Sequence, residues 1–428
     1  MEFKNTLDFA KLIDANDPLR SFRDEFHIPR HEGKETLYFT GNSLGLQPKQ
    51  TASYLNEELI LWKERGVDGH FEGKRPWFHY HKFAKEGLAK IVGALPEEVV
   101  PMNSLTTNLH LLMVSFYRPN KQRFKIITEA GAFPSDQYAL ESQVRFHGFD
   151  PKDAIIEVAP RKGETILRTE NIVSAIEENA KELALVLFSG VQYFTGQLFD
   201  IKTITKTGHK AGALVGFDLA HAAGNVPLHL HDHEVDFAVW CHYKYLNSGP
   251  GSVAGAFVHS KHGNNSELPR FAGWWGHSEE ERFLMKKGFK PMQGADGWQL
   301  SNANVLTTTA LLASLDVADR AGMDRMRIKS ELLTGYLEFL LKETFSEDKL
   351  KILTPSIKEE RGCQLSISLP GSGRAVFEKL LENGVVADWR EPNLGEGQAG
   401  VIRVAPTPLY NRFEDVYVFV QLLEKAMS

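Results

Sequence analysis

The stretch between residues 124 and 258 alternates short, uniformly apolar runs with longer segments that have a helical pattern. Strands that are buried on both faces read as continuous apolar runs, because neither face meets water. Strands that alternate with helices predict a mostly parallel sheet with helices packed on it. We therefore expect an α/β domain whose strands are residues 124–127, 154–158, 185–188, 214–217, 237–239 and 256–258.

Two helices are expected between these strands. Residues 135–147 predict a helix with Ser135 as its N-cap, and residues 169–180 predict a helix with Thr169 as its N-cap. Hydroxyl side chains favour these positions because they accept hydrogen bonds from the free N–H groups of a first helical turn.

The pattern changes in the last third of the chain. Residues 303–342 predict long helices. The following segments are shorter, with strands expected at 364–369 and 401–404 and a helix at 374–383. These elements indicate a smaller α+β domain at the C-terminus. The glycine-rich residues 393–400 predict a loop.

Composition restricts the class of protein. A chain of 428 residues exceeds one ordinary core, which favours two domains. The net charge of −6, without a basic block, argues against nucleic acid or a membrane surface as the main partner. No apolar stretch approaches the roughly 18 residues of a membrane helix, and the N-terminus lacks a signal pattern. Cys241 and Cys363 are expected to be reduced thiols in a cytoplasmic protein.

The expected sheet places polar side chains at its ligand-binding edge. Such sheets bind ligands beyond the carboxyl ends of their strands, and Ser189, Asp218 and Lys244 each lie just past such an end. A carboxylate after one strand and a lysine after a later one suit pyridoxal phosphate (PLP). The carboxylate faces the pyridine nitrogen, and the lysine amine bonds to the aldehyde. Alternatively, Asp218 caps a helix that begins at Leu219. His221 is expected to bond Asp218 or to lie under the ring.

Two further segments fit the same cofactor. The phosphate needs an anion receptor, and Leu105 and Thr106 open a helix whose N–H groups can supply one. A plain threonine N-cap is the alternative. Phe133 can stack on the ring and Asp136 can bond its hydroxyl group. The start of a helix explains residues 134–136 equally well, but does not require Phe133. The Tyr243 phenol can reach the phosphate or a reaction intermediate.

Together these segments resemble the kynureninase family, PLP enzymes of fold type I in the aspartate aminotransferase superfamily. The resemblance runs from residues 37–48 to residues 403–411, and its most specific segments are 73–77, 132–136, 188–193, 216–221, 243–247 and 361–365. It implies a PLP-dependent transferase-like large domain with a mostly parallel sheet and a smaller α+β C-terminal domain. The implied boundaries are 36–320 for the large domain and 321–428 for the small one, with residues 1–35 packing on the small domain.

The resemblance also assigns site residues. The same-chain cofactor shell comprises Leu105, Thr106, Phe133, Pro134, Ser135, Asp136, Ser189, Asp218, His221, Tyr243 and Lys244. Trp274 and Asn302 would close over PLP from a partner subunit, which implies a homodimer. Arg403 would clamp the substrate carboxylate. Ser43 and His70 would line the pocket. The ring preference would follow His70, Ser301 and Asn302. His70 and Asn302 could bond a ring hydroxyl group, which favours 3-hydroxykynurenine.

The implied reaction is hydrolytic Cβ–Cγ cleavage of L-kynurenine or 3-hydroxy-L-kynurenine. The products are L-alanine and anthranilate or 3-hydroxyanthranilate, in tryptophan catabolism or NAD biosynthesis. Lys244 would remove the α-proton, Asp218 would keep the ring nitrogen protonated, and Tyr243 is the candidate proton donor.

Three other functions remain open from the sequence. Cys363 could serve a cysteine desulfurase-like lyase, although it directly precedes a strand. His229, His231 and His233 alternate like metal ligands, but a polar surface loop is the favoured interpretation, so no metal is expected. A PLP-fold protein that binds without turnover is the third alternative.

Overall fold

The computed structural model describes residues 2–371, 373–391 and 400–428. The predicted loop at 393–400 lies outside these residues except for Gly400. Among the helices of the described residues, none combines the length and apolar character that crossing a membrane requires.

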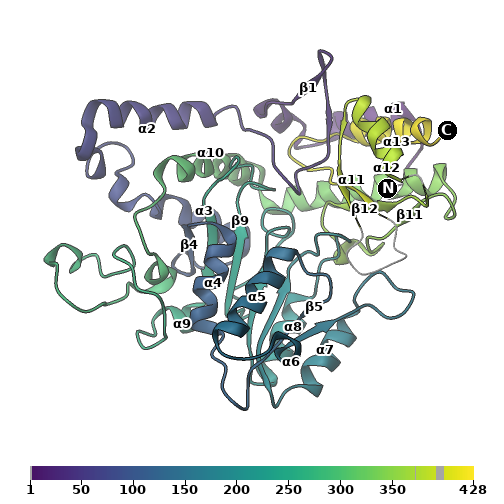
Figure 1. Ribbon diagram of the computed structural model, residues 1–428. Helices are drawn as coiled ribbons and strands as arrows, with labels where there is room; N and C mark the ends of the chain where they lie inside the picture. The colour runs from purple at the N-terminus through teal and green to yellow at the C-terminus, as the bar shows by residue number, and fades with distance from the viewer. Residues whose placement is uncertain (1, 372, 392–399) are drawn as a thin grey trace.

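A seven-stranded sheet forms the centre of the larger part of the chain (Figure 1). Its strand order is β4-β10-β9-β8-β7-β5-β6, and the five strands from β9 to β6 are all parallel. β10 runs antiparallel to β9 and β4. The predicted mostly parallel sheet is confirmed, whereas edge strand β4 was not predicted. The bounds are β4 Val99–Met102, β5 Lys125–Glu129, β6 Ile155–Val158, β7 Leu183–Ser189, β8 Leu214–Asp218, β9 Phe237–Cys241 and β10 Ala254–Val258.

Both faces of this sheet are covered, which explains the uniformly apolar strands. Neighbouring strand residues point to opposite faces. Ile126 and Leu185 belong to the core under α4 and α5, while Ile127 and Val186 belong to the core under α3, α7, α8 and α10. The helix bounds are α3 Lys82–Val92, α4 Leu105–Phe116, α5 Pro134–Phe146, α6 Pro151–Ala154, α7 Thr169–Glu178, α8 Ile201–Lys210, α9 Ser260–Gly263 and α10 Val305–Ala321.

Both predicted N-caps were wrong by one or two residues. α5 begins at Pro134, with Phe133 as N-cap, because proline has a helical φ and lacks the N–H group that a first turn leaves free. α7 begins at Thr169 itself, after Arg168, whose side chain makes no capping hydrogen bond.

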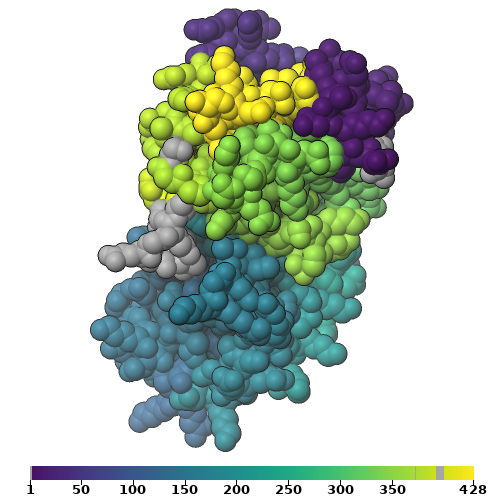
Figure 2. Space-filling model, turned by 90° about the vertical axis from the view of Figure 1, so that its right-hand side faces the viewer, coloured from purple at the N-terminus to yellow at the C-terminus, as the bar shows by residue number. Residues whose placement is uncertain are grey.

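A four-stranded antiparallel sheet, β11-β12-β15-β14, forms the second part, and confirms the predicted smaller α+β region. Its core includes residues from α11, α12 and α13 and from the N-terminal helix α1. Figure 2 shows the N-terminal segment in purple against α13 in yellow. The bounds are α1 Leu7–Asn16, α11 Met323–Thr344, β11 Lys351–Ile352, β12 Leu365–Ser368, α12 Gly373–Glu382, β14 Asp388–Arg390, β15 Val401–Val404 and α13 Phe413–Met427.

The remaining elements connect these two parts. α2 projects to one side of the molecule (Figure 1), and two small ribbons pair β1 with β2 and β3 with β13. The predicted domain boundaries after residues 35 and 320 stay predictions. The bounds are α2 Thr51–Arg65, β1 Arg30–His31, β2 Lys34–Glu35, β3 Leu37–Tyr38 and β13 Val385–Val386.

A buried ion pair ties the N-terminal segment to α11. The Nζ atom of Lys329 lies 2.7 Å from Oδ2 of Asp17, and the two side chains are 6% and 4% exposed. Asp17 also accepts a hydrogen bond from the N–H group of Leu19. A charge left without its partner in such surroundings is strongly unfavourable.

We therefore expect Asp17→Ala to lower the free energy of unfolding by about 3–5 kcal/mol, measured by urea unfolding. Asp319→Ala, which removes the exposed partner of Lys90, is the matched control and should cost at most about 1 kcal/mol. Equal effects of the two variants would contradict the assigned role of the buried pair.

Candidate active site

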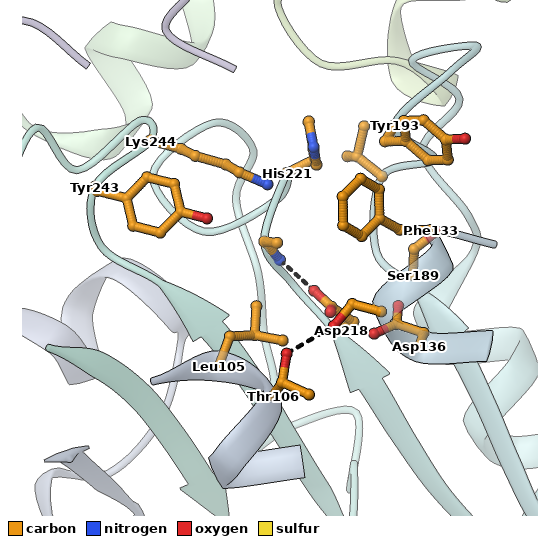
Figure 3. Close-up of a pocket in the computed structure, with 13 residues that line it drawn as sticks. Leu105, Thr106, Phe133, Asp136, Ser189, Tyr193, Asp218, His221, Tyr243 and Lys244 are labelled. Atoms are coloured by element: carbon orange, nitrogen blue, oxygen red, sulfur yellow. Dashed lines mark hydrogen bonds between the residues drawn. The ribbon is translucent and has the colours of Figure 1, made fainter. Parts of the chain in front are cut away.

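One pocket lies at the carboxyl ends of the central parallel strands (Figure 3). It gathers every same-chain residue of the predicted cofactor shell except Pro134. The helix N-termini of α4 and α5 and the segments after β7, β8 and β9 supply its walls. The lining residues are Leu105, Thr106, Phe133, Ser135, Asp136, Ser189, Val191, Tyr193, Asp218, Ala220, His221, Tyr243 and Lys244.

Asp218 is held by its own strand end. It is the last residue of β8 and is paired across the sheet with Ser189, the last residue of β7. Its Oδ1 atom accepts a hydrogen bond of 2.7 Å from the N–H group of Ala220. Turns rather than a helix follow at Leu219, so the structure does not support the helix-cap alternative.

Two other carboxyl groups are buried beside Asp218. The pKa of Asp136 lies well above its usual range because of burial and the neighbouring Asp218. Burial also raises the pKa of Asp218, against the opposing effects of the Ala220 N–H group and Lys244. Burial raises the pKa of Glu129 as well. Its carboxylate accepts hydrogen bonds from the Ser189 hydroxyl at 2.5 Å and from the Ser189 N–H group. Burial therefore disfavours the charged forms of all three carboxyl groups.

Lys244 and Tyr243 enter the pocket from the side opposite Asp136 (Figure 3). The Lys244 amine lies 5.9 Å from the centre of the Tyr243 ring. Burial raises the pKa of the Tyr243 phenol, which therefore keeps its proton at neutral pH. The positive charge of Lys244 lowers the pKa values of both Asp136 and Asp218.

Two flat side chains lie across the pocket. Phe133 is 46% exposed although it is apolar, and its ring meets Tyr193 edge-on with 5.2 Å between centroids. His221 is buried, and burial together with Lys244 and Arg403 holds its pKa well below the usual range. Its Nδ1 atom has no hydrogen-bond partner among the described residues. A neutral imidazole and an open phenyl face suit the two sides of an aromatic ligand.

The start of α4 offers an anion site. Ser104 is the N-cap but makes no capping hydrogen bond with its side chain, so the first N–H groups of α4 stay available. The hydroxyl groups of Thr106 and Ser135 lie 2.7 Å apart and join the N-termini of α4 and α5. Two adjacent helix N-termini with hydroxyl groups favour a phosphate. Thr106 is therefore not a simple N-cap.

Arg403 lies just behind the pocket wall. Its guanidinium is 1% exposed, lies 5.9 Å from the centre of the Tyr193 ring, and donates to the Tyr193 carbonyl at 2.8 Å. It also pairs with Asp388 on the neighbouring strand β14. Burial lowers its pKa, most strongly opposed by Asp388.

The other predicted residues do not line this pocket in one chain. These are Ser43, His70, Trp274, Ser301 and Asn302. His70 and Trp274 instead belong to one aromatic surface cluster, in which successive ring centroids lie 5.6–6.3 Å apart. This cluster comprises His70, Phe71, Phe78, Phe283 and Trp274.

Four residues of the site carried no predicted role. Val191, Tyr193 and Ala220 line the pocket, and Glu129 supports Ser189 from behind. Glu129 follows the apolar run at 124–127 just as Asp218 follows its own strand. Its position after an apolar run was therefore a sequence signal for Glu129.

The structure disfavours two of the alternative chemistries. The thiol of Cys363 is fully buried, lines no part of the pocket, and has a pKa that burial raises to about 12, whereas a nucleophilic cysteine needs an accessible thiolate. His231 bonds Glu98 at 2.9 Å and its ring stacks on His259 with an interplanar angle of 13°. Among the described residues His231 groups with Glu98 and His259, and not with His229 and His233, so the three candidate metal ligands do not converge on one site.

Comparison with known proteins agrees with this site. A family model described as "Kynureninase C-terminal domain" matches residues 326–423. The chain is 56% identical over 429 aligned positions to a kynureninase of Flavobacterium psychrophilum, with 100% of this chain and 99% of that protein covered.

Solved structures show the same fold at low sequence identity. The cysteine desulfurase CsdA of Escherichia coli is 16% identical with a TM-score of 0.75, and 95% of this chain and 98% of that chain are covered. A C-DES mutant with glycine covalently linked to the PLP cofactor is 17% identical with a TM-score of 0.73, covering 91% of this chain and 96% of that chain. The fold is that of these PLP enzymes, but the full-length identity is decisive: the chain belongs to the kynureninase family.

Proposed function

We propose that the protein is a PLP-dependent hydrolase that cleaves the Cβ–Cγ bond of L-kynurenine or 3-hydroxy-L-kynurenine. The products are L-alanine and anthranilate or 3-hydroxyanthranilate. The observation that carries this proposal is the pocket itself, in which Lys244 and a buried carboxyl cluster face the same space as an open helix N-terminus. The family to which the chain belongs supports the choice of substrate.

The pocket residues fit PLP. The uncapped start of α4, with Thr106 and Ser135, would hold the phosphate. Phe133 and His221 would lie against the ring, and Pro134 would fix the start of α5. Asp218 would face the ring nitrogen. When bound, PLP supplies an aldehyde that bonds to amino groups and a protonated ring that withdraws electrons from the substrate.

The chain's own groups then have distinct tasks. The carboxylate of Asp218 would hold a proton on the ring nitrogen, because a positive charge there relieves the repulsion within the carboxyl cluster. The amine of Lys244 would take the α-proton of the substrate. The Tyr243 phenol, kept protonated by burial, would donate a proton along the path. Arg403 would bind the substrate α-carboxylate through its planar donors.

A homodimer would complete the site. Neither Trp274 nor Asn302 lines the pocket of one chain. Trp274 belongs to a surface with many exposed apolar side chains, and Met285 is 71% exposed. Apolar surface of this kind indicates an interface, and a second copy is the occupant we propose. Trp274 of the partner subunit and Asn302 of the partner subunit would then close the pocket, which Ser43 would also line.

His70 supports a preference for the hydroxylated ring. Its Nδ1 atom lies 3.1 Å from the carbonyl of Val67, which can only accept a hydrogen bond. An imidazole that donates from Nδ1 to this carbonyl has Nε2 as an acceptor for a ring hydroxyl group in its neutral form. We propose 3-hydroxykynurenine as the better substrate, in tryptophan breakdown or NAD synthesis. We also propose a cytoplasmic location, in keeping with the two free, buried cysteines.

The first test removes the covalent link. Lys244→Ala should abolish the absorbance band of the bound cofactor and lower kcat about 10²–10⁴-fold, which is the contribution of a positioned base. Anthranilate fluorescence with kynurenine as substrate provides the activity assay. Lys202→Ala, a change at an exposed lysine of α8, should keep both the band and the activity. A Lys244→Ala protein with full turnover would refute the proposal, and a coloured wild type that releases no anthranilate would favour a binding protein.

The carboxyl cluster generates a pH prediction for the cofactor-free protein. Raised pKa values of Asp136 and Asp218 mean that the folded state binds protons more tightly than the unfolded state, so stability falls as pH rises through the folded-state values. Asp136→Asn should therefore stabilise the cofactor-free protein at pH 8 and much less at pH 5. Thermal unfolding at both pH values measures this, and a stabilisation that does not depend on pH would contradict it.

The substrate preference has its own test. We expect kcat/KM to be higher for 3-hydroxykynurenine than for kynurenine. His70→Ala should lower kcat/KM for the hydroxylated substrate about fivefold, since one hydrogen bond contributes about 1 kcal/mol, and leave kynurenine nearly unchanged. His147→Ala, at the end of α5, is the control. A wild type that prefers kynurenine would overturn the preference.

A further inference from the structure

The small sheet carries three charged side chains on one face beside the pocket. Asp388 of β14 and Arg403 of β15 are directly paired across the sheet. Arg390 lies two residues after Asp388 on the same strand, so its side chain leaves the sheet on the same side. The Asp388 carboxylate pairs with Arg403 and accepts a hydrogen bond of 3.1 Å from Arg390 through the same Oδ2 atom.

This charged group lies close to the catalytic residues. Arg403 donates to the carbonyl of Tyr193, whose side chain lines the pocket. Both Arg403 and Arg390 contribute to the lowered pKa of His221, after burial and Lys244. The small sheet thus brings two guanidinium groups to the pocket wall.

The charges do not balance within the described residues of this group. Two guanidinium groups face one carboxylate, which leaves one positive charge in excess. Arg403 is almost fully buried, and its Nε atom has no hydrogen-bond partner among the described residues. A buried donor without a partner is unfavourable, and an excess positive charge attracts an anion. One bound carboxylate would accept a hydrogen bond from the buried donor and would also balance the excess positive charge.

We propose that Asp388 is a positioning residue for the substrate carboxylate. By holding one side of the Arg403 guanidinium, it fixes the plane of that group and directs the remaining N–H donors toward the ligand. Arg390 leaves these three side chains with a net positive charge when Asp388 is paired with Arg403. This assignment rests on the proposed function, in which Arg403 clamps an α-amino acid, and it extends that function to two residues that do not line the pocket.

The mechanism explains why an aspartate serves here. A guanidinium can rotate about its long side chain, and orientation is what separates a two-point hydrogen bond from a weak charge contact. A carboxylate on the adjacent strand, in register with Arg403, removes that freedom before the ligand arrives. Less entropy is then lost on binding.

The test compares two substitutions in the PLP-loaded enzyme. Asp388→Ala removes the acceptor, so KM for kynurenine should rise at least tenfold while kcat changes less than threefold. Asp388→Asn keeps an acceptor oxygen in place and should stay within threefold of wild type. Glu378→Ala, which breaks an exposed pair with Arg374 on α12, is the matched control and should leave both constants unchanged.

A second readout does not depend on kynurenine turnover. Titration with L-alanine, followed by the cofactor absorbance band, should show at least tenfold weaker binding in Asp388→Ala. Titration with ethylamine, which lacks the carboxylate, should be unaffected. Before any ligand is added, the band of Asp388→Ala should match that of wild type. If Asp388→Ala does not fold, Asp388→Ser, whose hydroxyl is too short to reach the guanidinium, takes its place with the same expectation.

The outcomes distinguish the positioning role of Asp388 from the proposed function of the whole protein. Unchanged L-alanine binding in Asp388→Ala, equal damage in Asp388→Asn, or a joint loss of kcat, cofactor band and thermal stability would each overturn the positioning role. A wild type that binds L-alanine but does not cleave kynurenine would instead refute the proposed function, and the titrations would still decide the role of Asp388.

Discussion

The site depends on the burial of three carboxyl groups, two at the ends of strands β5 and β8 and one in the first turn of helix α5. Glu129, Asp136 and Asp218 lie together where water cannot screen their charges, and burial raises all three pKa values. Such a cluster is unfavourable by itself and becomes favourable when a cation lies against it. Lys244 provides one positive charge. A protonated ring nitrogen would provide the second, so the same electrostatics that make the carboxyl cluster unfavourable by itself would hold the cofactor.

A second electrostatic unit lies across the pocket with the opposite sign. Arg403 and Arg390 share Asp388, and the group retains an excess positive charge. In the proposed function, the large sheet would supply negative groups for the cofactor ring, and the small sheet would supply positive groups for a substrate acid. An amino acid bound between them would be oriented by charge before any chemistry occurs.

Local physical rules predicted much of this arrangement. The parallel strands were recognisable because both faces are covered, so Ile126 and Ile127 are apolar although they point in opposite directions. Asp218 and Ser189 were found because they follow such strands. Glu129 also ends such a strand, but it was not predicted. Edge strand β4 was not predicted because it is short and contains Pro101, and proline within an apolar run argues against a strand. The start of α5 was misplaced because proline at the first turn outweighed the serine cap.

The sequence by itself determined the parallel sheet, the pocket residues at its edge and the resemblance to one family. Each of these features depends on residues that lie close together in the chain. Only the tertiary structure decided how distant segments combine. It set Asp388 opposite Arg403, joined the hydroxyl groups of Thr106 and Ser135, and placed His70 and Trp274 in a surface cluster away from the pocket. These contacts depend on strand register and helix packing, which are fixed by the whole core and not by any one segment.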